Sequence, residues 1–274
     1  MIKNKRILVT GGAGSIGSEI VRQLAPSNKI FILDINETAT FDLREELNQD
    51  GHWIHSRHGD IRDINTVRDI FEDFKPQYVF HAGALKHVTP NEEYPLEAIQ
   101  TNIIGTYNVM SEAKRWECLE KFVFISTDKV VNGHSIMGAT KKVGEIMVRN
   151  QGKGFIAVRF GNVMGSRGSV IPLWQNQINR GKPITVTDER MERYMMTIPE
   201  AVNLVIEASQ IGKGGECFIL DMGKRVNVLE LAKKIVGKGE IKMIGMRKGE
   251  TLDEKLMTQE EEELAVKKGN FYII

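Results

Sequence analysis

A glycine-rich segment near the N-terminus places the tightest limit on how this chain folds. The segment TGGAGSIG (10–17) follows the apolar run KRILVT (5–10), which is typical of a buried β-strand, and it opens a helical stretch near 15–25. Glycines between a strand and a helix are typical of the first unit of a dinucleotide-binding domain. The sequence therefore predicts a Rossmann-like fold here.

The glycines of this loop have different structural roles. Gly11 permits the tight turn, Gly14 lets the backbone approach a pyrophosphate, and Gly17 allows the helix to pack closely on the strand. The helix then begins with Ser15 and Ile16, and amides at a helix N-terminus bind phosphates. We expect all five residues to bind the cofactor.

The second predicted strand ends in Asp34, about twenty residues beyond the loop. A carboxylate at this position accepts hydrogen bonds from the adenosine ribose hydroxyls. It would repel a 2′-phosphate, and the next basic residue is Arg44. The sequence therefore favours NAD over NADP as the cofactor.

The ends of the third and fourth predicted strands supply further cofactor contacts. Asp60 and Ile61 follow the third strand, beside the expected adenine. Ala82 and Gly83, in HAGA (81–84), follow the fourth and would run along the cofactor.

The first two-thirds of the chain alternates apolar runs with amphipathic stretches, which is typical of a doubly wound α/β parallel sheet. The expected strands are 5–10, 29–34, 52–58, 77–82, 121–126 and 154–160. The expected helices are 15–25, 37–48, 63–74, 95–115 and 135–150.

The regular alternation of strands and helices ends after residue 160. We expect helices at 170–180, 199–209 and 228–236 with strands at 184–186 and 217–221, and the run EEEE (260–263) as a solvated helix start. This pattern predicts an NAD-binding domain over 1–160 that also contains strand 217–221. Residues 161–274 are then mainly a small C-terminal substrate-binding lobe, made of 161–195 and 222–274.

Composition excludes several function classes. The chain has 37 basic and 36 acidic residues in 274, without a basic stripe, so we expect no nucleic-acid partner. Cys118 and Cys217 have no metal-ligand spacing, so we expect free thiols and no metal. The N-terminus leaves no room for a signal peptide, and no apolar run approaches the roughly 20 residues of a membrane span. These features predict a soluble cytoplasmic protein.

The fifth strand ends in STDK (126–129), and a helix begins near MGATKK (137–142). This layout resembles the extended short-chain dehydrogenase/reductase superfamily, in which a Ser or Thr acts with a YxxxK pair. Thr127 and Lys141 fit that pattern, whereas Met137 occupies the tyrosine position and cannot accept a proton. The resemblance implies that Lys141 holds the nicotinamide ribose and that Thr127 hydrogen-bonds the substrate hydroxyl.

Further motifs narrow the resemblance to the polysaccharide-biosynthesis group of UDP-N-acetylglucosamine 4,6-dehydratases, which includes members with Met for Tyr. The matching segments are HAGALKHV (81–88), YPLEAIQTNIIGT (94–106), STDK, MGATK, RFGNVMGSRGSVIPL (159–173), RYMMTIPEA (193–201) and RKGETLDEKL (247–256). They cover nearly the whole chain.

The resemblance implies a lyase reaction on a UDP-sugar. NAD oxidises C4, and Lys129, if neutral, then abstracts the C5 proton. A protonated Asp128 gives its proton to the departing C6 hydroxyl, and hydride return to C6 leaves a UDP-4-keto-6-deoxy-N-acetylhexosamine. Asp128 or a relayed water would take the 4-hydroxyl proton. Both key side chains need shifted pKa values, which a desolvated site can supply. Met137 favours retention at C5, by analogy with membrane-fused members.

Several residues would bind the UDP-sugar. Asn162 is positioned for the diphosphate, and the glycines before Ser169 and Val170 let the backbone approach phosphate or uracil. By resemblance, Arg193 and Arg247 lie near the diphosphate and Glu250 binds the ribose. Lys86 and His87 line the sugar pocket.

The sequence also departs from the family pattern. Gly133-His134-Ser135 replaces the usual proline-containing turn, and the chain ends soon after 247–256. Part of the substrate lobe is then missing or supplied by a neighbouring subunit, since the resemblance implies a homo-oligomer. Two alternatives stay open: a UDP-hexose 4-epimerase, which normally needs the tyrosine, and a catalytically silent protein that binds NAD or nucleotide-sugar.

Overall fold

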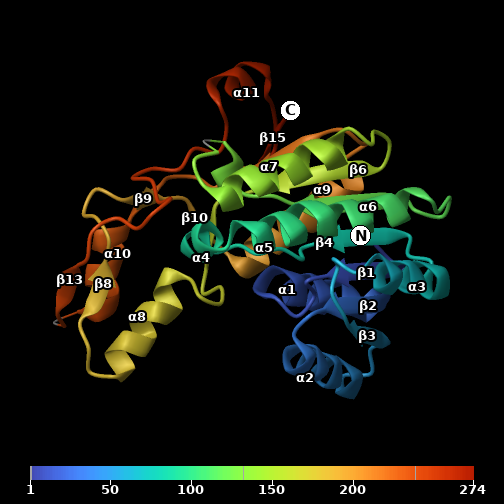
Figure 1. The fold of residues 1–274 in the computed structure, drawn as a ribbon, viewed down its shortest axis with the longest axis horizontal. Helices are drawn as coiled ribbons and strands as arrows, with labels where there is room; N and C mark the ends of the chain where they lie inside the picture. Colours follow the sequence, from blue (N-terminus) through green and yellow to red (C-terminus); the bar gives the residue numbers. More distant parts are fainter. Residues whose placement is uncertain (1, 132, 238) are drawn as a thin grey trace.

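A nine-stranded sheet forms the centre of the computed structural model, which describes residues 2–131, 133–237 and 239–274 (Figure 1). Its strands are β1 (Arg6–Thr10), β2 (Lys29–Asp34), β3 (Ile54–His58), β4 (Tyr78–His81), β5 (Lys121–Ile125), β6 (Phe155–Arg159), β11 (Cys217–Leu220), β14 (Val266–Lys268) and β15 (Phe271–Ile273). They lie in the order β14-β15-β11-β6-β5-β4-β1-β2-β3.

The strands from β3 to β11 are all parallel, with β1 between β2 and β4. In register, Ile7 lies opposite Ile30 on one side and Tyr78 on the other. Apolar side chains of these strands are buried because helices cover the sheet on both faces. The predicted Rossmann-like α/β fold is therefore confirmed.

Helices of the larger unit alternate with the strands. They are α1 (Ser15–Leu24), the 3₁₀ turn η1 (Ala25–Ser27), α2 (Glu37–Gln49), α3 (Ile64–Phe74), α4 (Val88–Glu93), α5 (Pro95–Ile99), the π-helical η2 (Gln100–Gly105), α6 (Thr106–Lys114), the 3₁₀ turn η3 (Asp128–Val130), α7 (Ile136–Arg149) and α9 (Ile198–Ile211). Helix α1 packs against α9, and α6 packs against both α3 and α7. The single helix expected over 95–115 is thus divided into α5, η2 and α6.

A smaller lobe lies beside the sheet, at the left of Figure 1. Its elements are α8 (Val170–Asn179), β8 (Ile184–Val186), β9 (Glu192–Arg193), β12 (Val226–Asn227), α10 (Val228–Val236) and β13 (Ile241–Met243). The short strands β7 (Asn162–Met164) and β10 (Met195–Thr197) pair in parallel where the chain passes between the two parts. Trp174, Val186, Met191 and Val228 belong to a separate apolar core in this lobe.

The C-terminal segment differs from the expectation that 222–274 belongs to the lobe. Strand β15 pairs antiparallel with β11 and with β14, so the end of the chain extends the large sheet. Phe271 is buried in the main core, as is Leu256 before helix α11 (Gln259–Leu264). The hairpin covers the edge of β11, whose backbone groups would otherwise lack partners on that side.

Cys118 is half-buried, Cys217 is buried, and both are free thiols. Among the residues that the structure describes, no His, Cys, Asp and Glu side chains form a cluster able to hold a metal. Within the same ranges, every helix is too short or too polar to cross a membrane.

Candidate active site

The glycine loop between β1 and α1 lines a cavity of about 550 Å³. Gly11 has φ +64°, and a Cβ there would lie 2.6 Å from the backbone nitrogen of Gly83. Helix α1 begins after Gly14, and no side chain in the described part of the chain caps it. Gly14, Ser15, Ile16 and Gly17 all line the cavity. The glycines therefore keep the turn free of Cβ atoms, and the resulting cradle fits a pyrophosphate group.

The other predicted cofactor residues differ in their relation to this loop. Asp34 ends β2 and accepts the amide N–H of Ala13 at 2.9 Å. Ala82 lines the cavity, whereas Asp34, Asp60, Ile61 and Gly83 are not among its lining residues. The carboxylate of Asp60 is held by Arg62, with 2.7 Å between Oδ2 and Nε. Ile61 is buried and packs on Gly105.

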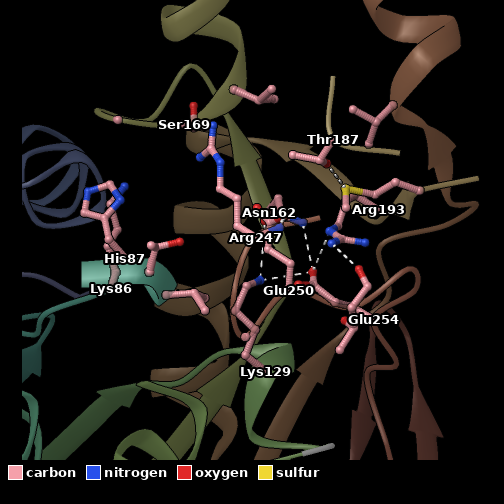
Figure 2. Close-up of a pocket in the computed structure, with 18 of the residues that line it drawn as sticks. Lys86, His87, Lys129, Asn162, Ser169, Thr187, Arg193, Arg247, Glu250 and Glu254 are labelled. Carbon is pink, nitrogen blue, oxygen red and sulfur yellow. Dashed lines mark hydrogen bonds and ion pairs between the residues drawn. The ribbon is translucent and has the colours of Figure 1, made fainter. Parts of the chain in front are cut away.

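A second cavity of about 580 Å³ opens between the sheet and the smaller lobe (Figure 2). It is lined by the residues predicted to bind the UDP-sugar, which are Lys86, His87, Asn162, Ser169, Val170, Arg193, Arg247 and Glu250. Thr127, predicted to contact the substrate hydroxyl, lines the glycine-loop cavity instead. His134 and Ser135, from the turn that departs from the family pattern, also line it.

The two cavities adjoin at a shared wall. Lys86, His87, Lys129, Asn162 and Ser169 line both of them. A group bound in the glycine-loop cavity and a ligand in the second cavity would therefore meet at Lys129. This arrangement suits chemistry that needs a cofactor and a substrate side by side.

Lys129 is held at this junction by acidic groups. Its Nζ lies 2.9 Å from Asp128 Oδ1 and 3.0 Å from Glu254 Oε2. Thr127 donates to the same Asp128 oxygen at 3.0 Å, and its own hydroxyl oxygen caps η3. The other Asp128 oxygen, Oδ2, is buried without a partner among the described residues. Asp128 therefore has one carboxyl oxygen that no described residue binds.

The electrostatics of Asp128 and Lys129 differ. Burial raises the pKa of Asp128 to about 6, against the opposing effect of Lys129. Burial by itself lowers the pKa of Lys129, but the charges of Asp128 and Glu254 outweigh it and raise the pKa above its ordinary value. The expected role of Lys129 as a base depends on a neutral amine, whereas the two carboxylates beside it favour the ammonium form in the resting site.

Lys141 and Met137 lie together on α7 and line the glycine-loop cavity. Lys141 donates to the carbonyl of Ile125 at 2.5 Å and lies over the ring of Phe124. Burial lowers its pKa to about 7. Met137 is buried and supplies no ionisable group in the place where the superfamily has its tyrosine.

The two predicted diphosphate arginines differ in their surroundings. Arg193 donates to the carbonyls of Glu192, Thr251 and Leu252, and its Nε lies 3.3 Å from Glu254. Its guanidinium is thus already well bonded within the chain. The backbone of Arg247 donates to the Glu250 carboxylate at 2.9 Å, and no pairing of its side chain is seen within the described residues.

Two residues at the site escaped the sequence analysis. Glu254 contacts Lys129 and Arg193, and Figure 2 shows these side chains converging on it. It lies in the quoted segment 247–256, but nothing in the spacing distinguishes it from its acidic neighbours. Arg167 donates to the carbonyl of Ala13 at 2.6 Å, so the loop after β7 reaches the glycine loop.

Comparison with known proteins agrees with this geometry. The model of a family described as polysaccharide biosynthesis protein matches residues 7–274. The chain is 46% identical over 277 residues to the capsular polysaccharide biosynthesis protein CapD of Staphylococcus aureus, covering 95% of this chain and 46% of CapD. It is 37% identical to a UDP-glucose 4-epimerase of Rickettsia bellii, covering 100% of this chain and 84% of that protein.

Two solved structures share the fold. Pen from Bacillus thuringiensis superposes with a TM-score of 0.91 and 38% identity, over 99% of this chain and 88% of that one. A Thermus thermophilus UDP-glucose 4-epimerase in complex with NAD gives a TM-score of 0.78 and 25% identity, over 90% and 88%.

The fold and the two adjoining cavities define a protein of the short-chain dehydrogenase/reductase class. Within that class, the chain belongs to the polysaccharide biosynthesis protein family. It spans less than half the length of CapD.

Proposed function

We propose that this chain catalyses the 4,6-dehydration of UDP-N-acetylglucosamine. The observation that carries the proposal is the Asp128–Lys129 pair, in which both residues line the second cavity and Lys129 also lines the glycine-loop cavity. Elimination of water from a sugar needs a base for the C5 proton and an acid for the C6 hydroxyl. This pair supplies both functions, whereas Met137 offers no phenol for the proton transfers of an ordinary dehydrogenase.

The proposal includes a bound nicotinamide dinucleotide, which would supply the oxidation at C4 and the later reduction at C6. The cradle formed by Gly11, Gly14 and Gly17 fits its pyrophosphate. The carboxylate of Asp34 beside that loop favours NAD over NADP, because it would repel a 2′-phosphate. The NAD complex of the similar Thermus epimerase supports the same assignment.

The chain's own residues would carry the protons. A shift of one proton from Lys129 Nζ to Asp128 Oδ1, across 2.9 Å, leaves an amine and a carboxylic acid. The oxidation at C4 would release the 4-hydroxyl proton to a relayed water. The amine then takes the C5 proton of the 4-ketone, and Asp128 gives its proton to the C6 oxygen, which leaves as water. When C6 is reduced, the ammonium of Lys129 returns a proton to C5, and a proton from solvent restores the pair. Asp128 is suited to this part because burial keeps its pKa near neutrality.

Other residues would hold the reactants. Thr127 would hydrogen-bond the 4-hydroxyl, and Lys141 would bind the nicotinamide ribose from the same cavity wall. Arg247 and Glu250 would bind the diphosphate and ribose of the UDP group. Arg193 would serve the diphosphate only after exchanging some of its present carbonyl contacts. Retention at C5 is part of the proposal, and proton NMR of the product tests it.

A UDP-hexose 4-epimerase is the second candidate. The observation favouring it is the 37% identity to a UDP-glucose 4-epimerase over the whole of this chain. Epimerisation and dehydration share the oxidation at C4 but differ in whether water is lost. The acid–base pair of Asp128 and Lys129, together with Met137 in place of a phenol, favours the elimination.

The test is to incubate the protein with NAD and UDP-N-acetylglucosamine and to measure the mass of the product by mass spectrometry. Loss of the mass of one water supports the dehydratase. A product of unchanged mass that separates from the substrate supports the epimerase. Recovery of substrate alone supports the catalytically silent alternative and contradicts the proposal.

A further inference from the structure

Glu254 has no assigned role in the chemistry, yet its carboxylate contacts the proposed catalytic lysine. Its side chain is about nine-tenths buried, and one oxygen, Oε2, meets three groups. These are Lys129 Nζ at 3.0 Å, Asn162 Nδ2 at 3.3 Å and Arg193 Nε at 3.3 Å. A buried carboxylate with such partners is a fixed negative charge.

The charged groups that face Lys129 come from several elements. Asp128 and Glu254 are the two anions in contact with it. Arg193, on β9, balances Glu254 from the far side, and Lys86 repels Lys129 across the cavity. Burial raises the pKa of Asp128. At Glu254, the charges of Lys129 and Arg193 outweigh burial and lower the pKa. The two carboxyl groups are therefore not equivalent.

The backbone near Glu254 is anchored from behind. Arg159, which is fully buried on β6, donates to the carbonyl of Leu256 at 2.9 Å. Arg159 also binds Glu261 at the start of α11, so the segment is fixed at Leu256 and again at Glu261. Glu254 is thus held against Lys129 by the core of the protein.

We propose that Glu254 is a positioning residue that acts through Lys129: its permanent negative charge keeps one proton on the Asp128–Lys129 pair. This role of Glu254 rests on the proposed dehydration. That chemistry needs a single proton on the two side chains together. This proton moves from Lys129 Nζ to Asp128 Oδ1 before the amine can act as a base. A second proton blocks the amine, and loss of the proton removes the acid.

The direction of the effect follows from charge alone. A neighbouring anion favours the protonated form of both an amine and a carboxyl group, so it raises both pKa values. Replacing Glu254 by Gln removes the charge and nearly preserves the shape. The pair in Glu254→Gln must then release its protons at lower pH.

The direct test measures the protonation of Lys129 without turnover. Wild type and Glu254→Gln, each saturated with NAD, are labelled with a trace of acetic anhydride across a series of pH values, and acetylation of Lys129 is read by peptide mass spectrometry. We expect Lys129 in Glu254→Gln to reach half-maximal labelling at a pH about 1 to 2 units lower than in wild type.

Two further variants separate charge from structure. Glu254→Asp keeps the charge and should return the labelling midpoint toward the wild-type value. Glu250→Gln removes a carboxylate that lines the same cavity but bonds to the Arg247 backbone, and it should leave the midpoint of Lys129 unchanged. An unchanged midpoint in Glu254→Gln, or an equal fall in Glu250→Gln, overturns the proposal.

Turnover gives an independent readout. Where the wild type dehydrates UDP-N-acetylglucosamine, both limbs of the pH–rate profile of Glu254→Gln should lie at lower pH, which a merely structural role would not produce. Where the wild type gives no dehydrated product but the labelling midpoint falls, the proposed function fails and the assignment of Glu254 stands.

Discussion

Arg159 donates two hydrogen bonds to Glu145 inside the protein, from Nη2 to Oε1 at 2.6 Å and from Nε to Oε2 at 3.2 Å. Both side chains are fully buried. Arg159 also binds Glu261 and the carbonyl of Leu256, while Ser126 donates to Glu145 at 2.6 Å. This network joins strand β6 to α7, to the end of β5 and to the C-terminal segment.

Each of these segments carries a residue of the candidate site. Ser126 directly precedes Thr127, and Glu145 lies one helical turn after Lys141. Leu256 lies two residues after Glu254. The ionic network therefore fixes, behind the cavity wall, the parts of the chain that meet at Lys129.

Breaking this network should cost much more stability than breaking a surface ion pair. Arg159→Met leaves the buried charge of Glu145 without its main partner, so the free energy of unfolding should fall by about 3–5 kcal/mol. Urea denaturation measures it. The control is Arg22→Met, which breaks the exposed pair with Glu46 and should cost about 0–1 kcal/mol. Equal losses in the two variants would show that the buried pair contributes nothing special.

The contribution of Glu261 should depend on pH. Burial alone raises the pKa of this carboxyl, but Arg159 outweighs it and lowers the pKa from 4.5 to about 2. Because the folded pKa is the lower one, the stabilisation is complete above the ordinary pKa and is lost as the pH falls toward 2. The stability gap between wild type and Glu261→Gln, measured by urea denaturation, should narrow steadily below pH 5. A gap that stays constant down to pH 3 contradicts this assignment.

A methyl group on Gly11 should weaken cofactor binding. Gly11 and Gly181 both have φ +64°, but a Cβ on Gly11 would meet the Gly83 backbone, whereas Gly181 faces open space. Gly11→Ala should raise the Kd for NAD about tenfold or more, since the Cβ would displace the backbone of the cradle, and a tenfold change corresponds to about 1.4 kcal/mol. Gly181→Ala carries the same φ penalty and should bind NAD like wild type. Calorimetric titration decides, and equal affinities in both variants would argue against the cradle.

Lys129→Ala should abolish turnover of UDP-N-acetylglucosamine and still bind NAD, because the amine is the proposed base at C5 while the glycine cradle remains. Product formation by chromatography and NAD binding by calorimetry give the two readouts. Lys233→Ala, which breaks an exposed pair with Glu230, is the surface control and should keep full activity. Normal turnover in Lys129→Ala would remove the lysine from the mechanism.

Local patterns in the sequence were enough to predict the Rossmann half of the fold. Apolar runs and the glycine loop located β1 to β6 to within about two residues, as expected where local pattern and fold agree. The C-terminal hairpin was missed because Lys267 and Lys268 give β14 a charged sequence, although Phe271 fills the core.

The residues of the site were predicted only where they belong to a local sequence motif. Lys129 and Glu254 are 125 positions apart, and Arg159 and Glu261 are 102 apart. Such pairs depend on how the C-terminal segment folds back on the sheet, which no local spacing encodes. For the same reason Glu261 was taken for a solvated glutamate in a helix start, although it pairs with a buried arginine.

The proposed elimination makes one demand that epimerisation does not: the C5 proton must leave the sugar. Turnover in D₂O, followed by mass spectrometry and proton NMR of the product, measures this directly. We predict a product that lacks one water and carries one solvent deuterium at C5, because Lys129 exchanges its protons with solvent through the open cavity. A product of unchanged composition with protium retained at C5 would contradict the dehydration and the part assigned to Asp128 and Lys129.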